Sequence, residues 1–309
     1  MTTAIVFPGQ GSQKPGMARD FHTRYAAARA VFAEASEATG LDMAALCFEE
    51  DPRLDQTEFT QPALLTAEIA MIRALQAEHG LTADCYGGHS LGEYTALCAA
   101  GVIPLAIAVK LVRTRGALMQ QAVPLGTGAM AAVIADQIAD RDLTPVLAGL
   151  QVDIGNRNSP NQLVLSGAAA DVERASARIV ELLAGVEHQV VALNVSAPFH
   201  SRLMRGIEPA FRAELEAAGP KLNPSRATTV TSNLTGAFHT GQLPALIDGL
   251  TKQISGAVDW ISNMKLLAAS ATQIYEVGPN RPLRGFFKTL GRDVTSILNV
   301  KSVEKGLPA

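Results

Sequence analysis

One serine in this chain of 309 residues stands between two glycines at the start of a predicted helix, where its hydroxyl could act as a nucleophile. The segment Gly88-His89-Ser90-Leu91-Gly92 fits the nucleophile elbow, a sharp turn from a strand into a helix that exposes the serine oxygen. Glycine is needed two residues to either side because neighbouring backbone passes too close for a Cβ atom. A hydroxyl in an ordinary tight turn is the alternative, so the surroundings of Ser90 must decide.

A nucleophilic serine requires a base, and six histidines compete for that role: His22, His79, His89, His188, His200 and His239. His200 follows a predicted strand and a proline, where the chain leaves its middle region, and such junctions favour clefts. The order of serine before histidine is also that of α/β-hydrolase-like proteins. His89 adjoins Ser90, but successive side chains diverge in an elbow, so a structural role is expected for it. His200 is therefore the first candidate, with a structural role as its alternative, and His239 is the second.

Arg115 lies on the apolar face of a helix predicted over residues 104–122. The residues that share this face at helical spacing are Ala108, Leu111, Val112, Leu118, Met119 and Ala122. A guanidinium that points inward keeps its charge and must be paired. Its partner is either an Asp or Glu of the protein, in a structural ion pair, or a carboxylate that arrives with the substrate.

A glycine-rich loop, Phe7-Pro8-Gly9-Gln10-Gly11-Ser12, follows the first predicted strand. It does not fit the dinucleotide-binding fingerprint, because Lys14 stands where the third glycine belongs, and it lacks a Gly-Lys-Ser/Thr ending. Such a loop can supply backbone N–H groups to an oxyanion, and a plain tight turn is the alternative.

Four basic residues near the C-terminus recur at spacings of three and four, which predicts that they share one helical face: Arg281, Arg284, Lys288 and Arg292. Such a stripe is usually a solvated surface, and the alternative is that it meets phosphates or an acidic protein. No cluster of histidine, cysteine or carboxylate side chains has the spacing of metal ligands, so no metal is expected.

The elements that must position these residues alternate between strand and helix. Strands are predicted over residues 3–7, 84–88, 227–233, 272–277 and 294–300, and helices over 60–79, 91–100 and 104–122. This alternation predicts an α/β-hydrolase-like fold, a mostly parallel sheet flanked by helices.

The middle of the chain has a different pattern. It reads as a strand at 128–135, a helix at 136–150, strands at 151–155 and 161–167, a helix at 169–185 and a strand at 188–196. The order βαββαβ is that of the ferredoxin-like unit. We therefore predict a small ferredoxin-like subdomain at residues 127–195, inserted into a large domain made of residues 1–126 and 196–309.

Composition argues against several classes of function. The net charge of −3 and the pI near 6.1 provide no basic field for nucleic acid or an anionic membrane. No apolar run approaches the roughly 18 residues of a transmembrane helix, and the N-terminal segment MTTAIVFPGQGSQ lacks the features of a signal peptide. The three scattered cysteines are expected to be reduced core residues. A cytoplasmic protein that binds neither nucleic acid nor membrane is expected.

The chain resembles the malonyl-CoA:acyl-carrier-protein transacylases of bacterial fatty-acid synthesis and the related trans-acting acyltransferases of polyketide assembly lines. The resemblance covers essentially the whole chain and rests on ordered motifs: FPGQGSQ, TQPALLT, GHSLGEY, VRTRGALMQ, GTGAMAAVI, NSPNQLVLSG, VSAPFHSRLM, TSNLTG and YEVGPNRPLRGFF. Two departures precede the elbow, where DCYGG replaces a more apolar run and Gly87 stands where alanine is common. Neither touches a residue proposed for the chemistry.

The resemblance implies a role for each candidate residue. Ser90 is acylated, His200 is its base, and Arg115 binds the malonyl carboxylate. The backbone N–H groups of Gln10 and Leu91 form an oxyanion hole, and a backbone carbonyl at Gln253 orients the histidine. The remaining expected substrate-site residues are Met119, His89 and Phe199, the last with a bulk that disfavours a branched α-carbon. The stripe of Arg281, Arg284, Lys288 and Arg292 is the candidate docking surface for the carrier protein.

The implied activity is transfer of a malonyl group from malonyl-CoA to the phosphopantetheine thiol of an acyl carrier protein, through a malonyl-serine and without a cofactor. The family is often monomeric, so a monomer is expected. One alternative is a serine hydrolase, including a proofreading thioesterase, which has no need for an inward arginine. Another is a non-catalytic docking module for carrier proteins, against which the joint presence of Ser90, His200, Arg115 and Gln10 argues. The motifs serve fatty-acid and polyketide synthesis alike.

Overall fold

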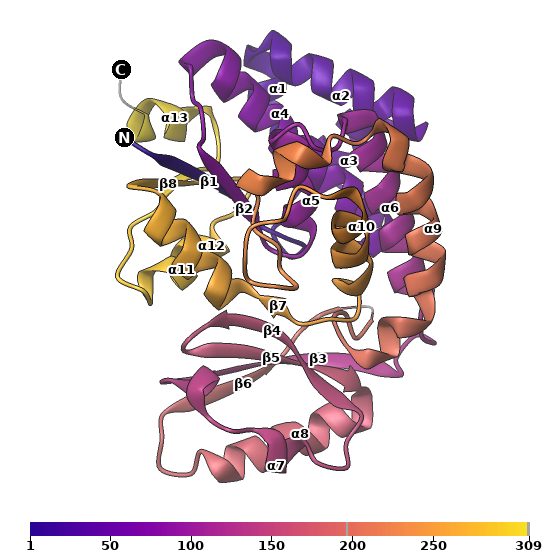
Figure 1. The fold of residues 1–309 in the computed structure, drawn as a ribbon, viewed down its shortest axis with the longest axis vertical. Helices are drawn as coiled ribbons and strands as arrows, with labels where there is room; N and C mark the ends of the chain where they lie inside the picture. The colour runs from indigo at the N-terminus through magenta and orange to yellow at the C-terminus, as the bar shows by residue number, and fades with distance from the viewer. Residues whose placement is uncertain (196, 308–309) are drawn as a thin grey trace.

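Two β-sheets organise the chain in the computed structural model, which describes residues 1–195 and 197–307 (Figure 1). The first sheet has the order β2-β1-β8-β9 and is parallel throughout; its strands are β1 (Thr3–Phe7), β2 (Cys85–Gly88), β8 (Gln273–Val277) and β9 (Thr295–Ile297). The second sheet has the order β6-β3-β5-β4-β7; its strands are β3 (Gly128–Ala135), β4 (Val152–Ser159), β5 (Gln162–Ala168), β6 (His188–Ala192) and β7 (Val258–Asp259).

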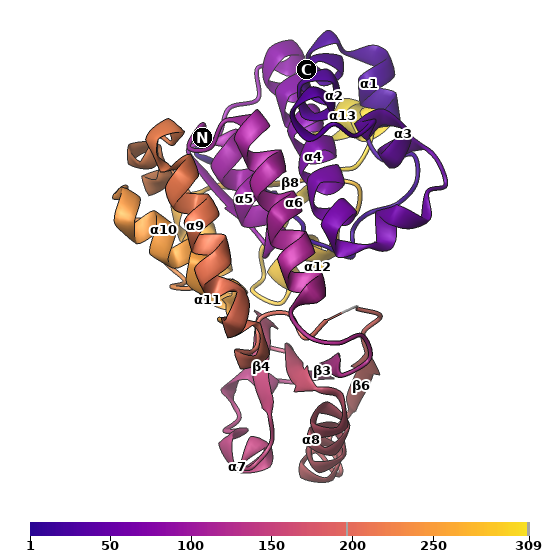
Figure 2. The ribbon, with the colours of Figure 1, turned by 90° about the vertical axis from the view of Figure 1, so that its right-hand side faces the viewer.

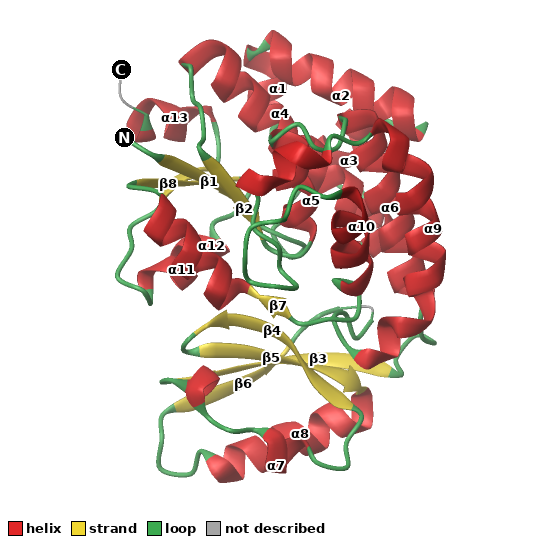
Figure 3. Ribbon diagram, viewed as in Figure 1, coloured by secondary structure: helices red, strands yellow, loops and turns green. Residues whose placement is uncertain are grey.

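Helices cover both faces of the first sheet, as Figure 3 shows. Successive side chains of a strand point to opposite faces, so Ile5 and Phe7 pack with α4 (Thr57–His79), α5 (Leu91–Ala99) and α6 (Leu105–Gln121). Ala4 and Val6 pack on the other face with α11 (Trp260–Ser270) and α12 (Pro282–Lys288). Burial on both faces explains the short, continuous apolar strands, and it confirms the predicted fold class.

Further helices enclose this core. Figure 2 shows α9 and α10 on one side of α5 and α6, and α1 to α3 on the other. Their bounds are α1 (Arg19–Arg24), α2 (Ala26–Thr39), α3 (Met43–Phe48), α9 (Glu208–Ala218), α10 (Leu243–Lys252) and α13 (Val300–Gly306). No helix within residues 1–195 and 197–307 is long and apolar enough to cross a membrane.

The second sheet has its own core. Four of its strands lie side by side in the order β6-β3-β5-β4, and neighbouring strands are antiparallel. This is the arrangement expected of a βαββαβ unit. Helix α8 (Ala169–Leu182) packs on the face away from the first sheet, around residues such as Val133, Leu165 and Ile179 (Figure 1). Strand β7 comes from the later part of the chain and pairs with β4 in parallel. The boundaries of the two domains stay a prediction, and Ser196, where two of the predicted segments meet, lies outside the described residues.

Two elements predicted from the sequence are wrong, because local hydrogen bonds interrupt the expected helix and replace part of the expected strand. The helix predicted over residues 136–150 is a 3-10 turn, Ile138–Asp140, and a single turn, α7 (Thr144–Leu147). The carboxylate of Asp142 accepts the N–H of Thr144, and Pro145 has no N–H to donate to the carbonyl of Arg141, so a continuous helix is interrupted here. The strand predicted over 227–233 begins inside a 3-10 helix, Pro224–Thr229, where threonine hydroxyls donate to the backbone three residues back. Only Val230 and Thr231 form isolated bridges.

Two other predicted strands are shorter in the structure. The strand expected over 294–300 covers only Thr295–Ile297, because Asn299 and Ser302 form a capping box that starts α13. The strand expected over 188–196 pairs with β3 only as far as Ala192.

Candidate active site

Ser90 lies in the turn between β2 and α5, with φ 53° and ψ −102°. This is a rare backbone conformation for a residue with a side chain, and such conformations concentrate at functional sites. A Cβ atom on Gly88 would lie 1.9 Å from the carbonyl oxygen of Gly92, and one on Gly92 would lie 2.2 Å from that of Phe7. Both glycines of the elbow are therefore required by backbone contact, as predicted.

His200 is the histidine that the fold brings to this serine. Its Nε2 lies 2.7 Å from Ser90 Oγ, and its Nδ1 lies 2.8 Å from the backbone oxygen of Gln253. Because a carbonyl oxygen can only accept, Nδ1 must carry the proton, which leaves Nε2 free to accept the proton of the serine. His200 itself has a positive φ of 58°, so both members of the pair occupy strained backbone.

The surroundings of His200 favour its neutral form. Burial, and then the positive charge of Arg115, lower the pKa of His200 to about 3. The imidazole is therefore uncharged near neutral pH, which is the form that can act as a base.

Arg115 lies on α6 and is 1% exposed. Its Nη2 donates to Ser90 Oγ at 3.1 Å and to Gln253 Oε1 at 3.0 Å, and its Nη1 donates to Gln61 Oε1 at 2.8 Å. Its Cζ lies 5.2 Å from the centre of the Tyr94 ring. Nε of Arg115 is buried without a hydrogen bond among the described residues.

Among the described residues, the hydrogen bonds and the ring contact of this buried cation are with neutral groups: the hydroxyl of Ser90, the amides of Gln61 and Gln253, and the ring of Tyr94. No carboxylate forms an ion pair with Arg115 in the part of the chain that the structure describes. A buried charge without a countercharge in contact is costly, so the site is suited to a ligand that brings a carboxylate. These contacts therefore differ from the alternative considered above, a direct ion pair of Arg115 with an Asp or Glu of the protein.

Gln253, at the C-terminal end of α10, contacts several of these groups. Its backbone oxygen accepts from His200, and its side-chain oxygen accepts from Arg115. Its side-chain nitrogen donates to the backbone oxygen of Ser90 at 3.1 Å and to Glu93 Oε2 at 2.7 Å. The sequence pointed to its carbonyl through the resemblance alone, and the contacts of its side chain were not predicted.

Three buried polar residues of the site escaped the sequence analysis: Gln61, Glu93 and Asn233. Asn233 Oδ1 accepts the backbone N–H of Ser90 at 2.6 Å, and its Nδ2 donates to the oxygen of Gly88 at 2.8 Å. Each of the three lies in a motif quoted above, TQPALLT, GHSLGEY or TSNLTG. A polar residue inside a buried segment must find a hydrogen-bond partner. This requirement was the signal in the sequence that could have identified the three residues.

The backbone N–H groups of Gln10 and Leu91 stay predicted oxyanion donors. Leu91 is the first residue of α5, where a backbone N–H has no partner inside the helix. The loop of Gln10 packs on the elbow, since a Cβ on Gly9 would lie 2.4 Å from the oxygen of His89. Within the described residues, neither backbone N–H takes part in a hydrogen bond. The side chain of Gln10 donates to Thr57 Oγ1 at 3.1 Å.

The roles in substrate binding expected of His89, Met119 and Phe199 stay predictions. His89 Nε2 lies 2.8 Å from Asn158 Oδ1, and its ring meets Trp260 edge-on, so its side chain is engaged by neighbours other than Ser90. Met119 lies one turn beyond Arg115 on α6, with its sulfur 3.8 Å from Gln61 Nε2. Phe199 is buried, and its backbone oxygen accepts from Ser166 Oγ at 2.6 Å.

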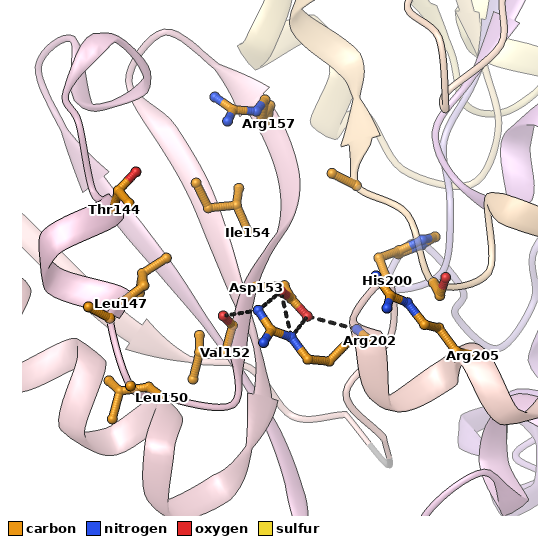
Figure 4. A pocket seen from close by; sticks show the side chains of 14 residues that line it. Thr144, Leu147, Leu150, Val152, Asp153, Ile154, Arg157, His200, Arg202 and Arg205 are labelled. Carbon is orange, nitrogen blue, oxygen red and sulfur yellow. Dashed lines mark hydrogen bonds and ion pairs between the residues drawn. The ribbon is translucent and has the colours of Figure 1, made fainter.

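A cavity of about 610 Å³ opens beside His200, between β4 and the segment of residues 200–205 (Figure 4). One wall carries the ion pair of Arg202 with Asp153, whose carboxylate also accepts the backbone N–H of Arg202 at 2.7 Å. Arg157 and Arg205 add basic side chains to the lining. No group of three or more His, Cys, Asp or Glu residues that could hold a metal occurs among residues 1–195 and 197–307.

The predicted basic stripe does not form one helical face. Helix α12 ends at Lys288, so it holds only Arg284 and Lys288, while Arg281 is its N-cap. Arg292 follows a turn closed by Gly291 at φ 67° and donates to the oxygen of Ala271 at 2.7 Å. Gly291 adopts a left-handed conformation, which ends the helix and with it the predicted spacing of the four basic residues.

Comparisons with known proteins agree with this geometry. The family model of the acyl transferase domain matches residues 4–257. A malonyl CoA-acyl carrier protein transacylase of Escherichia coli (strain K12) is 40% identical over 305 residues, which cover 97% of this chain and 96% of that protein. The protein of the same name from Bacillus subtilis (strain 168) is 38% identical over 299 residues, covering 95% and 92%.

Solved structures give the same result. A malonyl-CoA:acyl carrier protein transacylase from Xanthomonas oryzae pv. oryzae superposes with a TM-score of 0.89 at 38% identity, covering 99% of this chain and 98% of that one. A malonyl-transacylase in complex with its type II PKS acyl-carrier protein has a TM-score of 0.88 at 34% identity, with 99% of both chains covered.

Proposed function

The chain belongs to the acyl transferase domain family, and from this premise we propose that it transfers a malonyl group from malonyl-CoA to the phosphopantetheine thiol of an acyl carrier protein. The observation that carries the proposal is the position of Ser90 Oγ. It lies 2.7 Å from the imidazole of His200 and 3.1 Å from the guanidinium of Arg115, a buried cation that no carboxylate of the described residues contacts. A nucleophile, its base and a receptor for an acid group thus meet at one atom.

In the first step, His200 Nε2 takes the proton of Ser90 while Oγ attacks the thioester carbonyl of malonyl-CoA. The tetrahedral intermediate collapses by breaking the carbon–sulfur bond, and the CoA sulfur leaves as a thiol with the proton from His200. The product is a malonyl ester on Ser90. The backbone carbonyl of Gln253 keeps the proton on Nδ1 throughout, so the histidine remains in the useful tautomer.

In the second step, the phosphopantetheine thiol of the carrier gives its proton to the same nitrogen and attacks the serine ester. The carbon–oxygen bond breaks, Ser90 recovers its proton, and the malonyl group leaves as a new thioester. The backbone N–H groups of Gln10 and Leu91 serve both tetrahedral intermediates. Loss of one such donor typically lowers the rate by about 100- to 1,000-fold.

Arg115 provides selectivity for the acyl group. In a malonyl thioester the free carboxylate is separated from the reacting carbonyl by a single methylene. A guanidinium within hydrogen-bond distance of the nucleophile can therefore hold that carboxylate while the carbonyl meets Ser90 Oγ. An acyl group without a carboxylate leaves the buried cation uncompensated, which penalises it.

A transfer assay tests the proposal. The protein is incubated with radiolabelled malonyl-CoA, with or without a holo acyl carrier protein, and label is followed on the enzyme and on the carrier. We expect a malonyl-enzyme that persists without carrier and transfers its label when carrier is added. An adduct that is lost to water at the same rate with and without carrier indicates a hydrolase instead. Label on neither protein, with intact binding of carrier, indicates a docking module.

A further inference from the structure

We propose that Glu93 is a positioning residue, which holds the amides of Gln253 and Asn233 and through them the reactive arrangement of Ser90, His200 and Arg115. The inference rests on the proposed function for its meaning in acyl transfer. It concerns a carboxylate that forms no hydrogen bond with the side chains of Ser90, His200 or Arg115 among the described residues.

Glu93 lies one turn into α5 and is 1% exposed. Its Oε2 accepts from Gln253 Nε2 at 2.7 Å and from the backbone N–H of Asn233 at 3.0 Å. Its Oε1 lies 2.9 Å from His239 Nε2. Three residues that are about 140 to 160 positions away in the sequence thus converge on a single carboxylate.

The first link from Glu93 to the site is the Gln253 side chain. Its nitrogen donates to Glu93, which leaves its oxygen to accept from Arg115 Nη2 at 3.0 Å. Without an acceptor at Glu93, this amide could rotate and present a donor to the guanidinium. Glu93 therefore determines the orientation of the amide that Arg115 requires.

The second link supports the strained peptide of Ser90. The backbone N–H of Ser90 donates to Asn233 Oδ1, and its backbone oxygen accepts from Gln253 Nε2. Both of these amides belong to residues anchored on Glu93. A residue with φ 53° and ψ −102° persists only where its surroundings hold it, and these two amides are such surroundings.

The third link is electrostatic. Burial lowers the pKa of Arg115, and the negative charge of Glu93 is among the interactions that oppose this shift. Glu93 thus supplies a countercharge across the Gln253 side chain, while the face of the guanidinium beside Ser90 stays open to a substrate carboxylate. A direct ion pair would have closed that face.

The first test compares two acyl donors on the full chain. Acylation of Ser90 is measured with malonyl-CoA, by intact mass, and with p-nitrophenyl acetate, a neutral ester, by release of nitrophenolate. Because Glu93 acts on the nucleophile and its base, we expect Glu93→Gln to slow both reactions by about tenfold and Glu93→Ala by about 100-fold. These losses fall on kcat rather than on KM. Arg115→Ala, the comparison variant, should slow the malonyl reaction far more than the acetate reaction, whereas Glu93→Gln should slow both to a similar extent.

A matched control separates positioning from folding. Glu68 is another fully buried glutamate, whose carboxylate accepts from Thr95 Oγ1 at 2.6 Å and, among the described residues, forms no hydrogen bond with Ser90 or Arg115. Glu68→Gln should leave both acylation rates within twofold. A folded Glu93→Gln variant that matches the unsubstituted protein with both donors would overturn the proposal.

A double-mutant cycle tests the route through Gln253. Gln253→Ala removes the side-chain link while keeping the backbone carbonyl that His200 needs. In the Gln253→Ala variant, we expect Glu93→Gln to slow acylation further by less than about threefold, because the effects of substitutions at coupled residues are not additive. Fully additive losses would contradict the route. The reaction with p-nitrophenyl acetate does not involve malonyl-CoA or a carrier, so this outcome stands apart from any failure of the proposed function.

Discussion

The polar residues around Ser90 and the charged residues on the surface of the same molecule are held in different ways. Around Ser90 the residues Glu93, Arg115, Gln253 and Asn233 are almost fully buried. Arg115 donates to the Gln253 side chain, and Glu93 accepts from that side chain and from the backbone N–H of Asn233. Beside the cavity of Figure 4, Arg202 and Asp153 form a pair that is partly open to water. Removing one partner of a buried, hydrogen-bonded charge costs roughly 2–5 kcal/mol, whereas an exposed pair contributes about 0–1 kcal/mol. Under the proposed function, chemistry and acyl selectivity are therefore expected to depend on the buried group, and the surface charges to adjust them.

The largest effect is expected at the centre of the buried group. Ser90→Ala removes the nucleophile, so no malonyl adduct should form with malonyl-CoA, as measured by intact mass. The strained elbow and the other site residues remain in place, so the fold should be kept. If this variant still formed the malonyl adduct at full yield, the nucleophile would be a residue other than Ser90. The contrast between the buried group and the surface charges would then not hold.

The next effect is confined to one class of acyl group. Arg115→Ala should lower kcat/KM for malonyl transfer by about 100-fold, since it removes a buried charge that the substrate carboxylate would meet. Transfer of an uncharged acyl group such as acetyl should persist or rise. The two rates are compared in one assay with both CoA esters. An unchanged preference for malonyl would contradict the assignment of Arg115.

Stability at acidic pH provides a third measure of the buried group. The native pKa of His200 is about 3, because of burial and the charge of Arg115. In the unfolded chain a histidine titrates near about 6.5. Between these values the unfolded chain binds a proton that the native protein does not, so this residue lowers stability as pH falls. By about pH 5 the expected loss is of the order of 2 kcal/mol.

Urea unfolding between pH 4 and 8 checks this expectation. The His200→Ala variant should show a shallower fall in stability on acidification than the unsubstituted protein, whatever its stability at pH 8. Glu276 contributes with the opposite sign, because burial raises its pKa to about 7. Since Glu276 is present in both proteins, the difference between their slopes isolates His200. Identical slopes would mean that His200 is not held neutral.

The smallest effect is expected from the exposed charges. Replacing Arg284 and Lys288 of α12 by glutamate should weaken transfer to the carrier protein by up to about tenfold, because reversed charges repel an acidic partner. Acylation of Ser90 by malonyl-CoA should change less than twofold. Steady-state kcat/KM for the carrier, measured at low and at 0.5 M salt, reports this. An equal loss in acylation by malonyl-CoA and in transfer to the carrier would mean that these residues act in CoA binding or in folding instead.

Prediction from the sequence succeeded where short-range patterns decide the structure. The glycines of the elbow, the apolar strand at Thr3–Phe7 and the inward face of α6 follow from spacing alone. It failed where local hydrogen bonds override a pattern, as at Asp142 and Thr144, which interrupt an expected helix. It failed also at Arg292, where a left-handed glycine ends α12 before the predicted stripe is complete.

The sequence by itself predicted the candidate residues for acyl transfer, because an elbow serine, a later histidine and an arginine on an apolar helix face are visible as residue types at defined spacings. Only the tertiary structure decided which groups meet. His200 reaches Ser90 across 110 residues, and Glu93 reaches Asn233 and Gln253 across 140 and 160. Hydrogen-bond partners at such separations are selected by the packing of both sheets and their helices, and no local pattern in the chain encodes them.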